Sequence, residues 1–117
     1  MAFSILLNWL LIKNNNMTLD KLELEVIQWA HDRGLLKREN IQAQMCKITE
    51  EVGETAHAVL RGNQFGIKDG IGDIAVTIII LAAQHGMTLN ECLQAAYTEI
   101  KMRKGKLVDG VFIKEEA

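Results

Sequence analysis

The sequence contains no proline and only two cysteines, and both shortages limit what the chain can be. Proline removes a backbone donor and kinks helices, so its absence favours long uninterrupted helices. Cys46 and Cys92 fit no close-spaced metal motif, and two isolated thiols are typical of a reduced, intracellular protein. The three histidines are scattered, and none belongs to a His-Glu-x-x-His zinc pattern. We therefore expect a cytoplasmic protein without a zinc motif.

A strong excess of charge of either sign is also missing. The 117 residues suffice for one domain, and their formal net charge is -2. Binding to duplex nucleic acid would call for a strongly basic face, so we expect no nucleic-acid partner. Binding through the basic C-terminal end alone is a weaker alternative. Small phosphorylated ligands stay possible because they need only a local cluster of charge.

The first sixteen residues differ in character from the rest. Phe3 to Ile12 is almost wholly apolar, but a membrane-spanning helix needs about 20 such residues, so we expect no membrane partner. The segment also lacks the basic start and cleavage site of a secretory signal. Met17 opens a well-formed helix start. Residues 1–16 are thus either a non-native or loosely ordered extension or an extra helix on a partner subunit, and residues 17–117 form a single helical domain.

Four helices are predicted from apolar spacing and from capping signals. Asp20 followed by Glu23 has capping-box character at the start of the first helix. Asn40 can cap the second helix, and Thr88 with Glu91 forms a capping box for the fourth. A glycine follows each predicted end: Gly34, Gly62, Gly86 and Gly105. The predicted helices cover about 19–31, 41–61, 67–85 and 89–104.

A turn is predicted after the last helix. Asp109–Gly110 lies between apolar residues, which is typical of a small hairpin. Gly105 should end the fourth helix before this tail begins.

The apolar faces of the middle helices predict how the chain packs. In the second helix, apolar residues recur at steps of three and four: Ile41, Met45, Ile48, Val52, Ala56 and Val59. The third helix is apolar on every side from Ile74 to Ala83, with Thr77 as its only hydroxyl. Such a helix must be buried all round, which a domain of this size achieves most easily through a second subunit.

The second helix also carries three acids, Glu50, Glu51 and Glu54. The centre of this acidic face should point away from the apolar stripe. Like charges at three- and four-residue spacing destabilise a helix by about 0.2–0.5 kcal/mol per pair. A bound cation would offset that cost, whereas a solvated acidic face is the alternative.

Asp69 and Asp73 of the third helix are four residues apart and share a stripe that continues into apolar positions. A carboxylate on a buried face must pair, become protonated or bind a metal. Gly70 and Gly72 beside them, with Gly66 nearby, suggest close approach of another backbone or a ligand. Converging acids suit hard divalent cations such as magnesium. An ion-pair network with Lys47, Arg61 and Lys68 is the alternative.

The end of the fourth helix is basic. Lys101, Arg103, Lys104 and Lys106 follow Tyr97 within ten residues. Cations are common at a helix C-terminus because they complement the helix dipole. They could equally form a clamp for phosphates, in which arginine offers a bidentate fork and lysine a point charge.

Three segments together resemble the MazG-like, all-α nucleotide pyrophosphohydrolases. Lys47–Glu54 (KITEEVGE) resembles the Glu-Glu-x-x-Glu signature, and Asp69–Asp73 (DGIGD) resembles the second signature, usually Glu-x-x-Asp. Tyr97–Lys106 (YTEIKMRKGK) resembles the basic segment that closes the family core. The resemblance covers about residues 19–114.

Two positions depart from the family pattern. The acid three residues before the final Asp is replaced by Gly70, and the acid present is Asp69, one residue earlier. Asp69 could serve as that ligand or act in an outer shell, and the site could hold fewer metals. Thr98 stands where the family resemblance leads us to expect Asn.

The resemblance implies a four-helix-bundle-like protomer in a homodimer or homotetramer, with active sites near subunit contacts. It implies magnesium-dependent hydrolysis of nucleoside triphosphates, with non-standard or deoxynucleotides as the expected substrates. The products are nucleoside monophosphate and pyrophosphate, and Mn²⁺ is a possible substitute for Mg²⁺. The sequence does not reveal the preferred base or sugar.

Roles follow for the residues already singled out. Glu51, Glu54 and Asp73 would hold magnesium, with Asp69 as a fourth ligand. Glu50, a further candidate metal ligand, would orient or deprotonate the attacking water. The remaining residues would bind substrate: Lys101, Arg103 and Lys104 at the pyrophosphate, Lys47 in support with Lys68, Gln44 as a polar contact, and Trp29 stacked on the base.

Other interpretations remain open. A core position is the alternative for Trp29. For the whole protein, the alternatives are a non-catalytic helical oligomer that binds nucleotide or metal and a helical interaction module whose acids are simply solvated.

Overall fold

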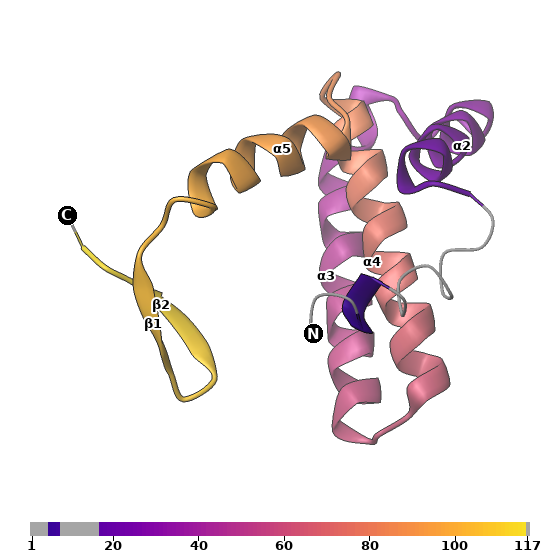
Figure 1. Cartoon of the computed structure of the whole chain (residues 1–117). Helices are drawn as coiled ribbons and strands as arrows, with labels where there is room; N and C mark the ends of the chain where they lie inside the picture. The colour runs from indigo at the N-terminus through magenta and orange to yellow at the C-terminus, as the bar shows by residue number, and fades with distance from the viewer. Residues whose placement is uncertain (1–4, 8–16, 117) are drawn as a thin grey trace.

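The computed structural model describes residues 5–7 and 17–116, so most of the predicted 1–16 extension lies outside the described residues. Every predicted helix is present, and the all-α expectation holds apart from a terminal hairpin (Figure 1). In chain order the elements are α2 Leu19–Asp32, the 3-10 turn η1 Arg38–Asn40, α3 Ile41–Leu60, α4 Gln64–Gln84, α5 Leu89–Ile100, β1 Gly105–Val108 and β2 Val111–Lys114.

Helices α3 and α4 form an antiparallel pair that is the centre of the fold (Figure 1). The turn between them uses Gly62 at φ 65°, as the sequence predicts. Asn63 then caps α4, because its side-chain oxygen accepts a hydrogen bond of 3.1 Å from the backbone N–H of Gly66. Helix α2 packs against α4. None of the helices described for residues 17–116 combines the length and hydropathy that crossing a bilayer requires.

The capping box predicted for α2 from Asp20 and Glu23 is wrong. Thr18, not Asp20, caps α2, since its hydroxyl accepts from the backbone N–H of Lys21 at 3.2 Å. Glu23 is buried and instead caps α5, where its carboxylate accepts from the backbone N–H groups of Leu89 and Asn90. Local spacing could not reveal this contact, which joins residues more than sixty positions apart.

The cap expected from Asn40 is also absent. Its side-chain amide donates to the carbonyl of Gly34 at 3.3 Å and makes no capping bond to α3. The asparagine therefore ties the loop after α2 to the start of α3.

The start of α5 follows the prediction and its end does not. Thr88 and Glu91 form the expected capping box. The helix ends at Ile100, four residues earlier than expected, and Gly105 begins β1 opposite Lys114 rather than ending the helix.

The predicted hairpin is confirmed. Asp109 at φ 49° and Gly110 at φ 79° form its two-residue turn, with both central residues in the left-handed region that such turns require.

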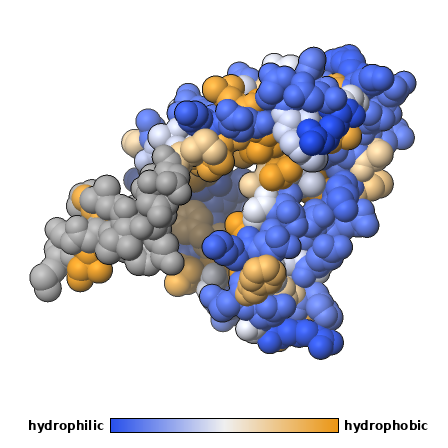
Figure 2. Space-filling view, turned by 90° about the vertical axis from the view of Figure 1, so that its right-hand side faces the viewer, coloured by the Kyte–Doolittle hydropathy of each residue, from blue (hydrophilic) through white to orange (hydrophobic). Residues whose placement is uncertain are grey.

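The core of the described chain is small. Its buried apolar residues are Ala30, Ile48, Ala58, Ile79, Ile80 and Ala82. Helix α5 has no buried residue, and both strands are exposed along their whole length. Figure 1 shows α5 and the hairpin leading away from the α3–α4 pair, and Figure 2 shows apolar side chains along the middle of one face. The four helices therefore do not close a bundle within one chain.

Candidate functional site

The face of α3 that packs against α4 coincides only in part with the face that apolar spacing predicts, since the two share Ile41 and Ile48. Met45, Val52 and Val59 are about half exposed, at 49%, 48% and 56%. The buried and half-buried positions form a different stripe, again at steps of three and four: Ile41, Gln44, Ile48, Glu51, Thr55 and Ala58. Three polar side chains thus lie between the two helices, and one of the predicted acids is among them.

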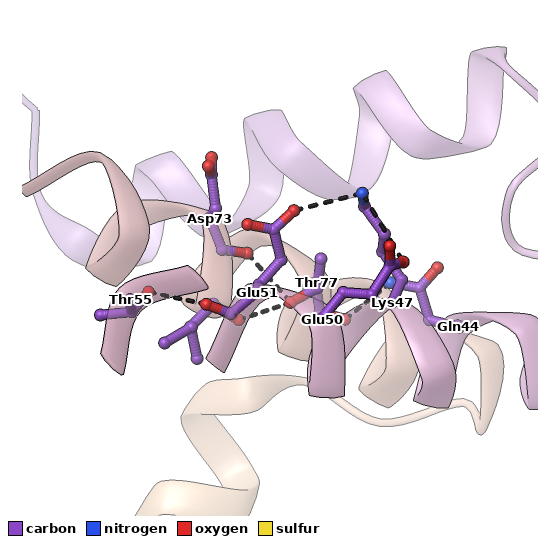
Figure 3. A network of polar contacts seen from close by, with 8 residues as sticks. Gln44, Lys47, Glu50, Glu51, Thr55, Asp73 and Thr77 are labelled. Atoms are coloured by element: carbon purple, nitrogen blue, oxygen red, sulfur yellow. Dashed lines mark hydrogen bonds and ion pairs between the residues drawn. The ribbon is translucent and has the colours of Figure 1, made fainter. Parts of the chain in front are cut away.

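Glu51 is only 7% exposed and lies beside Asp73 of α4 (Figure 3). This corrects the expectation that the acidic face of α3 points away from the packed side, although Glu50 and Glu54 do remain exposed. Lys47, one turn earlier, places its Nζ 3.3 Å from Glu51 Oε1 and 4.0 Å from Glu50 Oε2. The hydrogen bond that Lys47 donates to Glu51 and the charges of both glutamates raise the pKa of Lys47, so the lysine stays protonated.

At Asp73, by contrast, the surroundings disfavour the charged form of the side chain. Removal from water raises the pKa of its carboxyl above the ordinary value of 3.8, and the negative charges of Asp69 and Glu51 raise it further. Lys47 opposes this effect, and a hydrogen bond with Glu51 favours the protonated form. An acid whose charge is disfavoured by its surroundings is typical of a site prepared for a cation.

Hydrogen bonds from side chains to backbone carbonyls hold these turns in place. The Thr55 hydroxyl donates to the Glu51 carbonyl at 2.7 Å, and the Thr77 hydroxyl donates to the Asp73 carbonyl at 2.9 Å. Gln44 crosses between the helices, where its side-chain amide donates to the Thr77 carbonyl at 2.9 Å. The two carboxylates therefore project from turns that are tied to their own helices and to each other.

A cavity of about 370 Å³ opens beside the Glu51–Asp73 pair. Three side chains predicted to bind substrate line it, namely Trp29, Gln44 and Lys47. Leu35, Val76 and Ile80 form its apolar wall. An apolar wall with carboxylates and an amine at one end suits a ligand that has a flat ring and a charged group.

Trp29 itself is not a core residue. Its side chain is 45% exposed, and the guanidinium of Arg33 lies 4.3 Å from its ring centroid. The alternative of a core tryptophan is therefore wrong, because the ring borders the cavity and has solvent on one side.

A second cavity, of about 220 Å³, lies on the other side of Asp73. Glu54 and Asp69 border it, and so do His57 and Arg61. Asp73 lines both cavities, so it is the point at which they meet. Sequence reasoning did not assign His57 to the site, although its position three residues after Glu54 puts both on one side of α3.

The acids only partly fulfil the predicted convergence. Among residues 5–7 and 17–116, no group of three or more acidic, histidine or cysteine side chains is close enough together to hold a metal. Magnesium, however, needs only one or two carboxylates when water and phosphate oxygens complete its octahedron. The Glu51–Asp73 pair, with the raised pKa of Asp73, fits that requirement, and Glu54 and Asp69 border the adjoining cavity.

The alternative ion-pair network is present only in part. Lys47 pairs with Glu50 and Glu51. In the described part of the chain, neither Arg61 nor Lys68 lies within ion-pair distance of an acid. Among the residues that the structure describes, Glu54, Asp69 and Asp73 are thus without an ion-pair partner.

The basic residues after α5 do not meet the acids within one chain. Arg103 lies 3.9 Å from Glu99 of the preceding helix, α5, and Lys104 borders a separate cavity at the base of the hairpin. Figure 1 shows this segment standing apart from α3 and α4. Lys101 caps the end of α5. If these side chains act on a substrate held by the acids, a second chain must bring them there.

The sequence is similar to one known protein family and to a phage protein. The MazG nucleotide pyrophosphohydrolase domain family matches residues 39–108, which are more than half of the chain and include the five acids of the site, Glu50, Glu51, Glu54, Asp69 and Asp73. An uncharacterized 18.2 kDa protein from the rep-hol intergenic region of Haemophilus phage HP1 (strain HP1c1) is 40% identical over 67 residues. That alignment covers 57% of this chain but only 41% of the phage protein. No solved structure matches the chain.

Proposed function

Because the chain belongs to the MazG nucleotide pyrophosphohydrolase family, we propose that it hydrolyses nucleoside triphosphates to nucleoside monophosphate and pyrophosphate with magnesium as cofactor. The observation that carries this proposal is the buried Glu51 beside Asp73, next to a cavity with one apolar wall. Non-standard or deoxynucleotides are the substrates we favour.

In this proposal Glu51 and Asp73 hold the metal, with Glu54 and Asp69 completing the site from the adjoining cavity. The bound magnesium supplies charge neutralisation at the phosphates and a lowered pKa for the attacking water. Glu50 is our candidate for orienting that water, since Lys47 connects it with Glu51 while its own carboxylate remains exposed. Lys47 holds a proton throughout and offers a positive charge to the phosphates.

The cavity beside the acids would take the nucleoside. Trp29 offers a face for stacking, Val76 and Ile80 offer apolar contact, and Gln44 offers a polar group. The Nε2 of Gln44 is already engaged by the Thr77 carbonyl, which leaves the side-chain oxygen to accept a hydrogen bond from a base.

We further propose that the working form is a homodimer or homotetramer. The supporting observation is that Met45, Val52 and Val59 of α3 are exposed, and so are the large apolar residues of α5, Leu93, Tyr97 and Ile100. Contiguous apolar surfaces of this kind mark contact sites between proteins. A partner that covers them would also bring Lys101, Arg103 and Lys104 toward the acids, where they would neutralise the leaving pyrophosphate.

A second candidate function has one observation in its favour. Gly70 occupies the position of an acid in the family pattern, so the chain could bind nucleotide or metal without hydrolysing it. Incubation with a panel of standard and modified triphosphates and magnesium, followed by pyrophosphate detection, separates the two candidates. We expect pyrophosphate and monophosphate in equal amounts from at least one substrate. A rise in melting temperature with nucleotide and magnesium, but no pyrophosphate from any substrate, would favour the non-catalytic binder.

A further inference from the structure

Gly70 lies in the interior of α4, and Thr55 of α3 packs directly against it. A Cβ atom added at residue 70 would lie 2.1 Å from Thr55 Oγ1, 2.9 Å from Thr55 Cβ and 3.1 Å from Thr55 Cγ2. Rotation of the threonine side chain could move the oxygen but not the Cβ, whose place is set by the backbone. The two helices can therefore approach this closely only if residue 70 has no side chain.

This contact sits one helical turn from each carboxylate of the site. Thr55 follows Glu51 by four residues and donates a hydrogen bond to the Glu51 carbonyl at 2.7 Å. Gly70 precedes Asp73 by three residues and is itself buried. Since a helix is rigid over one turn, the distance between the backbones at Thr55 and Gly70 sets the distance between the turns that carry Glu51 and Asp73.

Two other helical glycines are free of this constraint, since a Cβ added at Gly53 of α3 or at Gly72 of α4 would meet nothing within 4 Å. Gly66 of α4 is crowded too, with Ala58 Cβ of α3 at 3.1 Å from the added atom and Asn63 Nδ2 at 2.8 Å. The tightest contact is nevertheless at residue 70, the position where the family pattern has an acid.

We propose that Gly70 and Thr55 are positioning residues, whose contact sets the separation at which Glu51 and Asp73 bind one magnesium ion. The inference rests on the proposed function, because it assigns a purpose to the geometry of that same site. It also accounts for the missing acid. A carboxylate side chain at residue 70 has no room beside Thr55, so the close approach of the helices takes the place of the acid that the family pattern has at this position.

The test compares magnesium affinity, measured by isothermal titration calorimetry with magnesium chloride alone, in four proteins. They are the wild type, Gly70→Ala, the exchanged pair Thr55→Gly/Gly70→Ala, and the matched control Gly53→Ala. The exchange moves the glycine from α4 to α3, so the number of helical glycines is unchanged and the close approach is kept. Residues that orient metal ligands typically change affinity by about 10–100-fold, which is the loss we expect for Gly70→Ala.

The exchanged pair should regain the wild-type affinity, and Gly53→Ala should not differ from the wild type. The kinetic counterpart is a higher magnesium concentration for half-maximal turnover in Gly70→Ala, with the KM for nucleotide unchanged at saturating magnesium. Wild-type affinity in Gly70→Ala, or a folded exchanged pair that still binds weakly, overturns the proposal. If Gly70→Ala does not fold, the exchanged pair alone decides between these outcomes.

Calorimetry keeps this test separate from the proposed function. A wild type that binds magnesium but releases no pyrophosphate contradicts hydrolysis and leaves the comparison of affinities valid. A wild type that binds no magnesium overturns the positioning proposal together with the metal site.

Discussion

Glu51 and Asp73 lie side by side between two antiparallel helices, and the cation within ion-pair distance of Glu51 is Lys47, at 3.3 Å. Two carboxylates and one ammonium group leave a net negative charge in a place with restricted access to water. This unfavourable arrangement of charge lies beside the cavities of about 220 and 370 Å³, both of which Asp73 lines.

Glu54→Gln should abolish magnesium-dependent pyrophosphate release while the fold and the oligomer survive. The side chain is exposed, so its loss costs little stability, but the amide cannot serve as a charged ligand. Even groups that only orient metal ligands change activity by about 10–100-fold, so we expect a loss of about 100-fold or more in kcat. Glu25→Gln, on the exposed surface of α2, is the matched control and should be fully active. Undiminished turnover in Glu54→Gln would remove this residue from the mechanism.

Asp73→Asn should make the metal-free protein more stable at neutral pH. The raised pKa of Asp73 means that the folded state favours the protonated carboxyl. The stability from this group is thus complete below its ordinary pKa of 3.8 and is lost as the pH rises through the raised value. Asparagine stays neutral, so its melting temperature should exceed that of the wild type at pH 7, with the gap closing toward pH 4.

The melting temperature of Asp73→Asn in the presence of magnesium is a second test. Magnesium should raise the melting temperature of the wild type, whose carboxylate it binds, and leave that of Asp73→Asn nearly unchanged. A variant that is less stable than the wild type at pH 7 without metal would show that Asp73 is a structural residue.

Glu23→Ala should destabilise the protein through α5. The buried carboxylate satisfies the first backbone N–H groups of that helix, including that of Asn90 at 3.1 Å. Leaving buried donors without a partner costs about 1–3 kcal/mol, which urea denaturation can measure. Glu25→Ala should change the free energy of unfolding by less than about 0.5 kcal/mol, as exposed substitutions usually do. Equal effects for the two variants would contradict a capping role for Glu23.

Trp29→Ala should raise the KM for the nucleotide and leave kcat nearly intact. Stacking on a base is worth about 1–3 kcal/mol, so we expect KM to rise about tenfold or more. Trp29→Phe, which keeps an aromatic face, should recover part of the loss. Because the side chain is 45% exposed, neither change should lower the melting temperature much. A large drop in stability with an unchanged KM would assign the ring to packing.

Mixing two inactive variants should restore activity if the basic segment acts on a partner. One variant carries Glu54→Gln, and the other carries Lys101→Ala, Arg103→Ala and Lys104→Ala. A mixed dimer then has one site with intact acids and an intact basic segment from the other chain. Random mixing in equal amounts predicts about a quarter of the wild-type activity after subunit exchange. No recovery in dimers shown by mass spectrometry to be mixed would place the basic residues in the site of their own chain or outside it.

Much of the local structure can be predicted from the sequence because short-range interactions determine it. The capping box of Thr88 and Glu91 and the left-handed turns at Gly62 and Gly110 depend on residues within a few positions. The Asp109–Gly110 hairpin is equally local. The acidic motif is visible for the same reason, since its spacing reflects a single helix.

Only the tertiary structure decided which faces meet. Apolar spacing points to Met45, Val52 and Val59 as the packed side of α3, yet the chain places Gln44, Glu51 and Thr55 against α4 and leaves the apolar side exposed. Glu23 at the start of α5 and Gly70 against Thr55 likewise depend on residues that are distant in sequence. The physical reason is that burial free energy depends on what lies opposite a side chain. A stripe that is half polar becomes the inner face when polar groups lie opposite it, as Asp73 and the Thr77 carbonyl do here, and Met45, Val52 and Val59 are then left for another surface.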